Sequence, residues 1–324
     1  MVPACLARTR ARPDTPIHST SFGHHRPDRH ATRTSVPPSP LPKQPERKFA
    51  TRRFHRFAPG EMKGIPDFAR ARLEQRSIVM VTAYDTPQAR MVAASDVDAI
   101  LVGDSVAMVI HGLPSTLHAT VELMTLHTAA VRRGAPDHVI VADLPFLAVR
   151  RGCTAAVDAA GALLRAGATA VKAEGVTGHA EVLAHLVGSG IPVMGHLGLT
   201  PQSINLLGGY RMQGRSADSA VRLRNEARQV ADAGAFALVL ECIPEALAAE
   251  ITAALPIPTI GIGAGAHTAG QVLVITDLLG QDPGFRPRFA RCYHDGHAAG
   301  LAALNAFAGD VRAARFPTAT EIPA

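Results

Sequence analysis

Eight short apolar runs, rich in β-branched residues, recur along the chain from residue 78 onward and limit the possible fold more than any other feature. The runs cover residues 78–85, 99–105, 138–146, 170–175, 191–199, 236–244, 257–265 and 272–277. Ala-rich helical stretches separate most of them, for example residues 121–133, 154–165 and 217–233. Continuous apolar strands that alternate with helices predict right-handed βαβ units and a parallel sheet.

Eight such units favour a closed (β/α)₈ barrel over an open sheet. Residues 66–73 predict a short entry helix, because Pro66 suits its first turn. Only residues 266–271 separate the last two runs, which is short for a crossover helix. We therefore expect residues 296–308 to supply the eighth outer helix.

The first 60 residues differ in composition from the rest. They are rich in Pro, Arg, Ser, Thr and His, and they hold 12 of the 33 basic but only 3 of the 27 acidic residues. Such a segment buries too little apolar surface to offset the entropy of ordering. We predict a disordered basic extension over residues 1–61, dispensable or upstream of a start at Met62, and a catalytic barrel domain over residues 62–324.

The net charge of +6 belongs to this extension, because 21 basic and 24 acidic residues remain in the body. A near-neutral body gives no support for a nucleic-acid-binding core. No apolar run reaches the roughly 18 residues of a membrane helix. Four widely spaced cysteines without a C-x-x-C pair argue against a structural zinc site and a secreted disulfide scaffold. We therefore predict a cytoplasmic protein with neither nucleic-acid nor membrane partners.

Charged side chains follow the apolar runs, where the carboxyl ends of barrel strands form the active site of such folds. These residues are Asp85, Asp104, Asp143, Glu174, His196 and Glu241. Lys172 and Glu174 are two positions apart, so on a strand they face the same way. A single acid at a strand end often caps the next helix instead. Six charged residues at strand ends together favour a site.

The site residues suggest a metal-assisted reaction of a 2-oxo acid. Asp104, Asp143 and Glu174 supply only oxygen ligands, which favours Mg²⁺ or Mn²⁺ over zinc, with some ligands bound through water. Such an ion chelates the ketone and carboxylate of the acid and stabilises its enolate. Lys172 then offsets the substrate carboxylate and Ser105 hydrogen-bonds it.

Two further side chains complete this prediction. Glu241 is a candidate proton acceptor or donor. His196 either donates a hydrogen bond to the ligand or has a structural role. Residues 261–266 resemble a dinucleotide-binding loop only superficially, since Arg286 stands where an acid is needed. There we expect close backbone packing.

An ordered series of motifs resembles the ketopantoate (3-methyl-2-oxobutanoate) hydroxymethyltransferase family over residues 64–317. The motifs include Leu101-Val102-Gly103-Asp104-Ser105, Ala142-Asp143-Leu144-Pro145-Phe146, Val171-Lys172-Ala173-Glu174-Gly175, Gly195-His196-Leu197-Gly198-Leu199-Thr200-Pro201-Gln202-Ser203 and Leu240-Glu241-Cys242-Ile243-Pro244. The resemblance implies a TIM barrel of the phosphoenolpyruvate/pyruvate type that assembles into a homodecamer. It also implies transfer of a hydroxymethyl group from 5,10-methylenetetrahydrofolate to 3-methyl-2-oxobutanoate, which gives 2-dehydropantoate in pantothenate synthesis.

The same resemblance assigns roles to individual residues. It implies one Mg²⁺ per subunit, held by Asp104, Asp143 and Glu174. It makes Asp104, Ser105, Asp143, Lys172 and His196 contacts of the keto acid, and Glu241 the catalytic proton acceptor.

Two alternatives remain open at this point. One is a lyase or mutase of the same barrel superfamily that acts on a 2-oxo acid without folate. The other is a scaffold or RNA-binding protein with an inert barrel, whose basic extension binds the partner.

Overall fold

The computed structural model describes residues 62, 64–284, 287–318 and 320–322, so the extension predicted over residues 1–61 lies outside the described residues. Eight strands occur in the described part of the chain. They are β1 (Ile78–Thr82), β2 (Ala99–Val102), β3 (Val139–Asp143), β4 (Ala170–Glu174), β5 (Val193–Gly198), β6 (Ala237–Glu241), β7 (Thr259–Ile262) and β8 (Gly270–Leu273).

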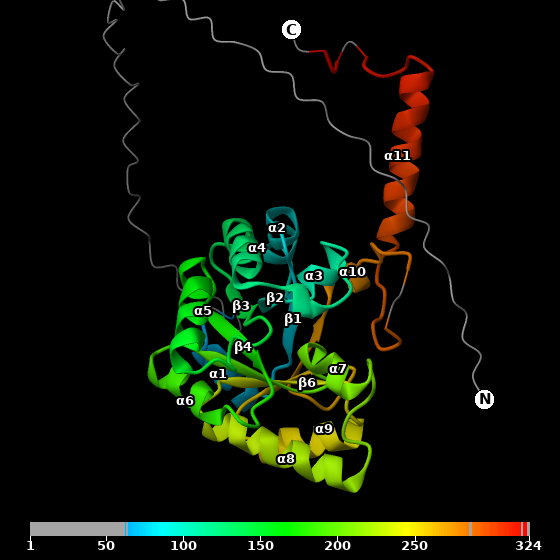
Figure 1. The fold of residues 1–324 in the computed structure, drawn as a ribbon. Helices are drawn as coiled ribbons and strands as arrows, with labels where there is room; N and C mark the ends of the chain where they lie inside the picture. Colours follow the sequence, from blue (N-terminus) through cyan, green and yellow to red (C-terminus); the bar gives the residue numbers. More distant parts are fainter. Residues whose placement is uncertain (1–61, 63, 285–286, 319, 323–324) are drawn as a thin grey trace, which may run out of the picture. The chain divides into compact units, whose positions relative to one another are not determined.

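The strands form a closed parallel barrel in the order β1 to β8, with β8 returning to β1. The predicted (β/α)₈ class is therefore confirmed. Seven of the apolar runs contain a strand, and the run at residues 272–277 overlaps the end of β8. The parallel register follows from the crossovers. All strands point the same way, so their carboxyl ends meet at one end of the barrel (Figure 1).

Helices follow most strands, and most of those from α1 to α10 lie around the barrel (Figure 1). They are α1 (Pro66–Leu73), α2 (Thr86–Ala93), α3 (Val106–Val109), α4 (Val121–Gly134), α5 (Cys153–Arg165), α6 (Ala180–Gly188), α7 (Ile204–Leu207), α8 (Ala217–Asp232), α9 (Glu245–Ala254), α10 (Ile275–Leu278) and α11 (Gly296–Arg312). Two 3₁₀ turns, η1 (Thr116–His118) and η2 (Pro201–Ser203), lie in the loops after β2 and β5.

The last unit of the barrel differs from the sequence-based expectation. β8 starts at Gly270 rather than residue 272, and residues 275–278 form α10 instead of continuing the strand. A side chain at position 270 would collide with the backbone of Ile78, so a glycine here lets β8 approach β1. The predicted helix at residues 296–308 is present as α11, but none of its residues is buried, so it has no packed face.

The barrel interior is filled by alternate residues of the strands. Its cluster includes Leu101, Val141, Met194 and Val239, all buried. The same cluster contains Phe68 of α1, which is fully buried and meets Phe236 edge to face at 5.0 Å between ring centroids. Because Phe236 precedes β6, the entry helix closes the amino-terminal end of the barrel.

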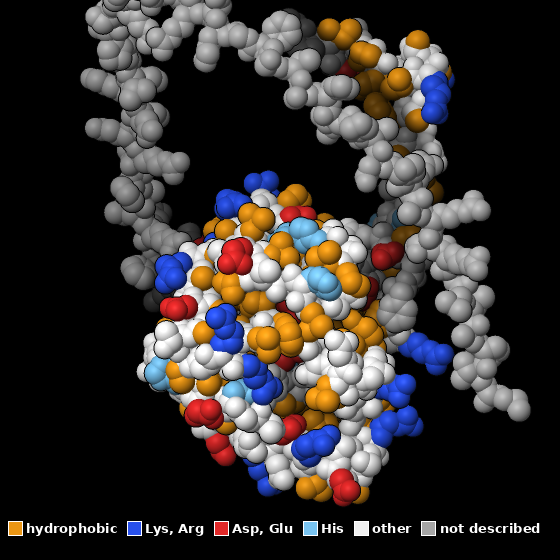
Figure 2. All heavy atoms as spheres, in the orientation of Figure 1, with side chains coloured by type: hydrophobic (Ala, Val, Ile, Leu, Met, Phe, Trp, Pro, Cys, Tyr) orange, Lys and Arg blue, Asp and Glu red, His pale blue; other side chains and the backbone are white. Residues whose placement is uncertain are grey.

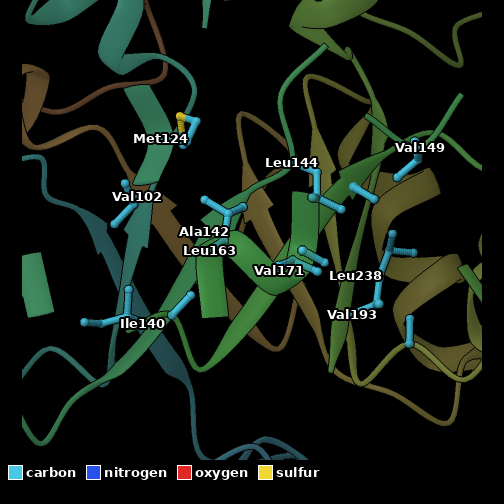
Figure 3. Close-up of a cluster of buried hydrophobic side chains, with 14 of the residues drawn as sticks. Val102, Met124, Ile140, Ala142, Leu144, Val149, Leu163, Val171, Val193 and Leu238 are labelled. Atoms are coloured by element: carbon cyan, nitrogen blue, oxygen red, sulfur yellow. The ribbon is translucent and has the colours of Figure 1, made fainter. Parts of the chain in front are cut away.

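A second apolar cluster lies between the outer faces of the strands and the helices. Figure 3 shows part of it, with Val102, Ile140 and Val171 on strands, Met124 and Leu163 on helices. Packing on both faces explains why the strands are continuous apolar runs rather than alternating ones.

Candidate active site

The charged residues occupy inward positions near the carboxyl ends of their strands. Asp143 follows the interior residue Val141 by two positions, and Glu241 follows Val239 in the same way. His196 likewise follows Met194. Since side chains alternate along a strand, these groups continue the column that fills the barrel. The apolar interior therefore ends in a charged layer at its carboxyl end.

Strand register brings these side chains together. Asp143 is the register partner of Lys172, and Lys172 Nζ lies 3.0 Å from Asp143 Oδ1. Glu174 is the partner of His196, whose Nδ1 lies 3.3 Å from Glu174 Oε1. The same Nδ1 is 3.1 Å from Lys172 Nζ. His196 Nε2 lies 3.1 Å from Glu241 Oε2. Strands β3 to β6 thus contribute to one connected cluster.

Asp104 joins this cluster from the loop directly after β2. Its backbone N–H donates to Asp143 Oδ2 at 3.0 Å. Gly103 precedes it, and a Cβ there would meet the Ser105 hydroxyl, so a glycine permits the tight turn. Of the predicted site residues, Asp104, Asp143, Lys172, Glu174 and His196 are all less than 10% exposed. Ser105 and Glu241 are partly exposed.

Two of the carboxyl groups, those of Asp104 and Asp143, are destabilised in their ionised form. Burial, with the negative charges of Asp143 and Glu174, raises the pKa of Asp104 well above its ordinary range. Burial also raises the pKa of Asp143, although Lys172 opposes the change. Two acids that resist ionisation in one buried site indicate a position where an added cation is favourable.

The remaining groups are stabilised in their charged forms. Burial opposes the charge on Glu174, but His196 and Lys172 outweigh it and lower the pKa of this carboxyl. Burial and Lys172 act against protonation of His196, yet Glu174 and Glu241 raise the pKa of its ring to about 9. Burial likewise disfavours the charged ammonium of Lys172, but Asp143, Glu174 and Asp104 raise its pKa. At neutral pH the cluster holds two cations against up to four carboxylates.

The donor set suits a hard divalent cation that keeps water or substrate oxygens as ligands. In the part of the chain that the structure describes, no three His, Cys, Asp or Glu side chains are arranged to enclose an ion directly. Mg²⁺ is commonly held by one or two carboxylates plus waters and substrate, so a closed cage is not required. Asp104 and Asp143 support this fit, because both carboxyl groups are buried and the pKa of each is raised.

Ser105 has a fixed orientation in the structure. Its hydroxyl lies 2.8 Å from the hydroxyl of Tyr84, which is fully buried at the end of β1. Tyr84 has no role in the sequence analysis. Nothing in the residue pattern showed that a tyrosine after β1 reaches a serine after β2.

Asp85 does not belong to the site, which corrects the expectation that six strand-end residues converge. Its Oδ1 accepts the backbone N–H of Gln88 at 2.7 Å, so it is the N-cap of α2. The expected close packing at residues 261–266 is confirmed. A Cβ at Gly261 would lie 2.6 Å from Thr268 Oγ1, and one at Gly263 2.8 Å from Phe289.

Gln202 is a second residue that the sequence analysis left without a role. It lies on η2 after β5, and its side-chain amide donates to Asp104 Oδ2 at 2.8 Å. Its backbone N–H donates to Glu174 Oε2 at 2.9 Å. The only available signal was its place in the motif of residues 195–203.

Exposed apolar side chains occur in the loops that follow the strands. They include Val109, Ile110, Leu113, Phe146, Leu147, Tyr210 and Met212. The space-filling view shows hydrophobic side chains spread over the face between scattered charged groups (Figure 2). Apolar loops beside a charged floor suit an organic ligand with both polar and apolar parts. Among the described residues, no helix is long and apolar enough to cross a bilayer.

A closed (β/α)₈ barrel with a buried acid–base cluster at its carboxyl end has the architecture of a TIM-barrel enzyme. Comparison with known proteins gives the family. The family model of ketopantoate hydroxymethyltransferase matches residues 63–319. The chain belongs to the ketopantoate hydroxymethyltransferase family.

Curated relatives agree with this assignment. The 3-methyl-2-oxobutanoate hydroxymethyltransferase of Bdellovibrio bacteriovorus is 51% identical over 260 residues, covering 80% of this chain and 99% of the relative. The enzyme of the same name from Legionella pneumophila is 48% identical over 254 residues, covering 78% and 97%. The resemblance inferred from motifs is confirmed, and so is the predicted hydroxymethyltransferase class.

Solved structures share the fold at low sequence identity. Phosphonopyruvate hydrolase, in a complex with oxalate and Mg²⁺, has a TM-score of 0.53 at 11% identity, covering 81% of this chain and 92% of that one. A putative phosphonomutase from Burkholderia cenocepacia has a TM-score of 0.52 at 17% identity, covering 77% and 99%. At such identities the likeness establishes the fold alone.

Proposed function

We propose that this chain transfers a hydroxymethyl group from 5,10-methylenetetrahydrofolate to 3-methyl-2-oxobutanoate, giving 2-dehydropantoate, with one Mg²⁺ per subunit. The observation that carries the proposal is the buried cluster that joins Asp143, Lys172, Glu174, His196 and Glu241 within hydrogen-bonding distance. It combines groups for binding an α-keto carboxylate with a partly exposed carboxylate that accepts a proton.

The keto acid binds through its carboxylate and ketone oxygens. Lys172 stays protonated at neutral pH and supplies positive charge to the substrate carboxylate. Ser105, held by Tyr84, donates a hydrogen bond to the same ligand. His196 Nε2, which lies 3.1 Å from Glu241 Oε2, adds a further donor beside that carboxylate.

Asp104, Asp143 and Glu174 would hold the magnesium ion, directly or through water. When bound, the ion supplies positive charge beside the ketone oxygen and so lowers the pKa of the neighbouring C–H bond. The raised pKa of Asp104 and the burial of all three carboxyl groups are the observations that support this assignment.

Glu241 accepts the proton from C3 of the substrate. Its side chain is 15% exposed, whereas that of His196 beside it is 3% exposed. Of these two residues, Glu241 is therefore the one that is open to the ligand. C3 then forms a bond to the one-carbon unit of the folate. Both bonds from that carbon to the folate nitrogens break, and water supplies the hydroxyl oxygen. The two folate nitrogens take up the proton removed from C3 and one proton of the water.

A folate-independent lyase or mutase is less well supported. Phosphonopyruvate hydrolase and the putative phosphonomutase share only the barrel fold, at 11% and 17% identity, whereas the hydroxymethyltransferases reach 51%. No observation in the structure favours this second function.

Proton exchange at C3 tests the proposal without folate. In D₂O, the wild-type protein with Mg²⁺ and 3-methyl-2-oxobutanoate should exchange the C3 proton, which NMR follows. Replacing Glu241 with Gln should slow exchange by roughly 10²- to 10⁴-fold, because a positioned base is removed. Asp143→Ala should abolish the Mg²⁺-dependent part. Exchange at the wild-type rate in Glu241→Gln would contradict its role as base.

The assembly and location follow from the same family resemblance. We propose a cytoplasmic homodecamer of the barrel domain, residues 62–324. Native mass spectrometry should give a mass near ten chains of 34.0 kDa each. A monomer or dimer at micromolar concentration would contradict the decamer.

A further inference from the structure

Gln202 links two strand ends that have no direct bond to each other. Its side chain reaches Asp104 after β2, 98 positions away in sequence, while its backbone N–H reaches Glu174 at the end of β4, 28 positions away. Both carboxylates belong to the set assigned above to the metal. The residue therefore holds two metal-assigned groups through two different bonds.

The orientation of the Gln202 amide is fixed by its partners. Nε2 donates to Asp104 Oδ2 at 2.8 Å and also to the carbonyl oxygen of Leu144 at 3.0 Å. Both partners are acceptors, so the NH₂ group must face them and the amide cannot be reversed. Leu144 is adjacent to Asp143, and its N–H donates to the carbonyl of Lys172. The amide is thereby anchored to the backbone beside the third carboxylate.

The backbone bond to Glu174 is also determined locally. Gln202 is the second residue of the turn η2, and the preceding Pro201 has no N–H to donate. The Gln202 N–H is therefore the first on this turn that can reach Glu174. On the other side of that carboxylate, His196 lies at Oε1, so the Glu174 group is held from two sides.

We propose that Gln202 is a positioning residue that orients Asp104 and Glu174 for the divalent cation. This inference rests on the proposed function, because it concerns the carboxylates assigned to the metal there. Partners that hold metal ligands in place contribute to affinity, and their removal typically weakens metal binding roughly 10- to 100-fold. Gln202 has no acid–base chemistry of its own, so it acts through the two carboxylates.

Direct metal binding tests the proposal without catalysis. The probe is Mn²⁺, titrated into the full chain by electron paramagnetic resonance without keto acid or folate. Gln202→Met has a similar shape but no donor, and it should weaken Mn²⁺ binding roughly 10- to 100-fold. At saturating Mg²⁺ the C3 exchange rate of this variant should recover toward wild type, because every proposed metal ligand and the base remain present.

Gln213→Met is the matched control. Gln213 lies on the same loop, and its side chain donates to the carbonyl of Arg211 rather than to a carboxylate. Its Mn²⁺ affinity should equal that of wild type. Thermal unfolding shows whether each variant is folded. If Gln202→Met does not fold, Gln202→Asn, which keeps the amide one methylene short, is titrated and should also bind more weakly.

The outcomes separate this inference from the proposed function. Wild-type affinity in the folded Gln202 variant, with binding lost in Asp143→Ala, would overturn the positioning role and leave the metal site standing. Equal Mn²⁺ binding by wild type and Asp143→Ala would overturn the metal assignment itself. Weak binding in both Gln202 and Asp143 variants, with Gln213→Met unchanged, is the result we expect.

Discussion

At the scale of single residues, Lys172 is the buried cation on which the charged layer depends. Its side chain is 5% exposed and lies against Asp143 and His196. Because the pKa of Lys172 is raised, the charge that stabilises the fold is present at neutral pH and is lost only as the pH rises above the ordinary range of lysine.

Lys172→Met should therefore impair both stability and binding. Removing one partner of a buried ion pair costs about 3 kcal/mol or more, since Asp143 loses its partner. Urea denaturation measures this loss. The KM for the keto acid, measured at saturating folate, should also rise in this variant. A variant that unfolds like wild type would show that the buried carboxylates are neutral without the lysine.

Asp85 provides a contrasting residue, because it caps a helix rather than serving the site. Asp85→Ala removes the acceptor for the Gln88 N–H and should lower the free energy of unfolding by about 1 kcal/mol. The C3 exchange rate should stay at the wild-type level. Asp85→Asn is the matched control, since Asn caps a helix as well as Asp. A loss of exchange in both variants would show that Asp85 belongs to the site.

The residues of the site were predictable to the extent that they lie on strands. Asp143, Glu174 and Glu241 follow apolar runs, and period-two alternation places their side chains inward. The roles of Gln202 and Tyr84 depend on contacts between loops distant in sequence, which no local pattern records. Asp85 was misjudged because an acid after a strand either caps the next helix or enters the barrel, and only the fold decides which.

At the scale of elements, α1 closes the amino-terminal end of the barrel. Phe68→Ala should lower the free energy of unfolding by about 3–5 kcal/mol, because a fully buried ring is removed from the interior cluster. Leu73 on the same helix is 81% exposed, so Leu73→Ala should change stability by at most about 0.5 kcal/mol. Urea denaturation of both variants checks this contrast, and equal effects would contradict the closing role of α1.

Element boundaries were predictable where packing and periodicity agree. The helices α1, α4, α5 and α8 begin and end within one residue of the sequence-based ranges. The last unit was not predictable in the same way. An apolar run continues through β8 into α10, and a run of this kind does not distinguish a strand from a short buried helix. The sequence pattern predicted a helix at α11, but it did not predict that this helix has no buried face.

At the scale of the whole molecule, closure of the barrel is what assembles the site. Its residues come from five successive units between β2 and β6, and adjacent register brings Asp143 beside Lys172 and Glu174 beside His196. The amino-terminal extension contributes none of these residues. The part of the chain needed for chemistry therefore begins where the barrel begins.

A chain that starts at Met62 should retain the activity of the full chain. Met62 is 5% exposed and belongs to the interior cluster with Phe68, and the family match begins at residue 63. The C3 exchange rate and the midpoint of thermal unfolding should equal those of the full chain. A chain that starts at Arg76 is the matched control, because it also lacks α1 and should be far less stable. If the chain from Met62 instead lost exchange together with salt-dependent RNA binding, the extension would be part of the function, as the RNA-binding alternative requires.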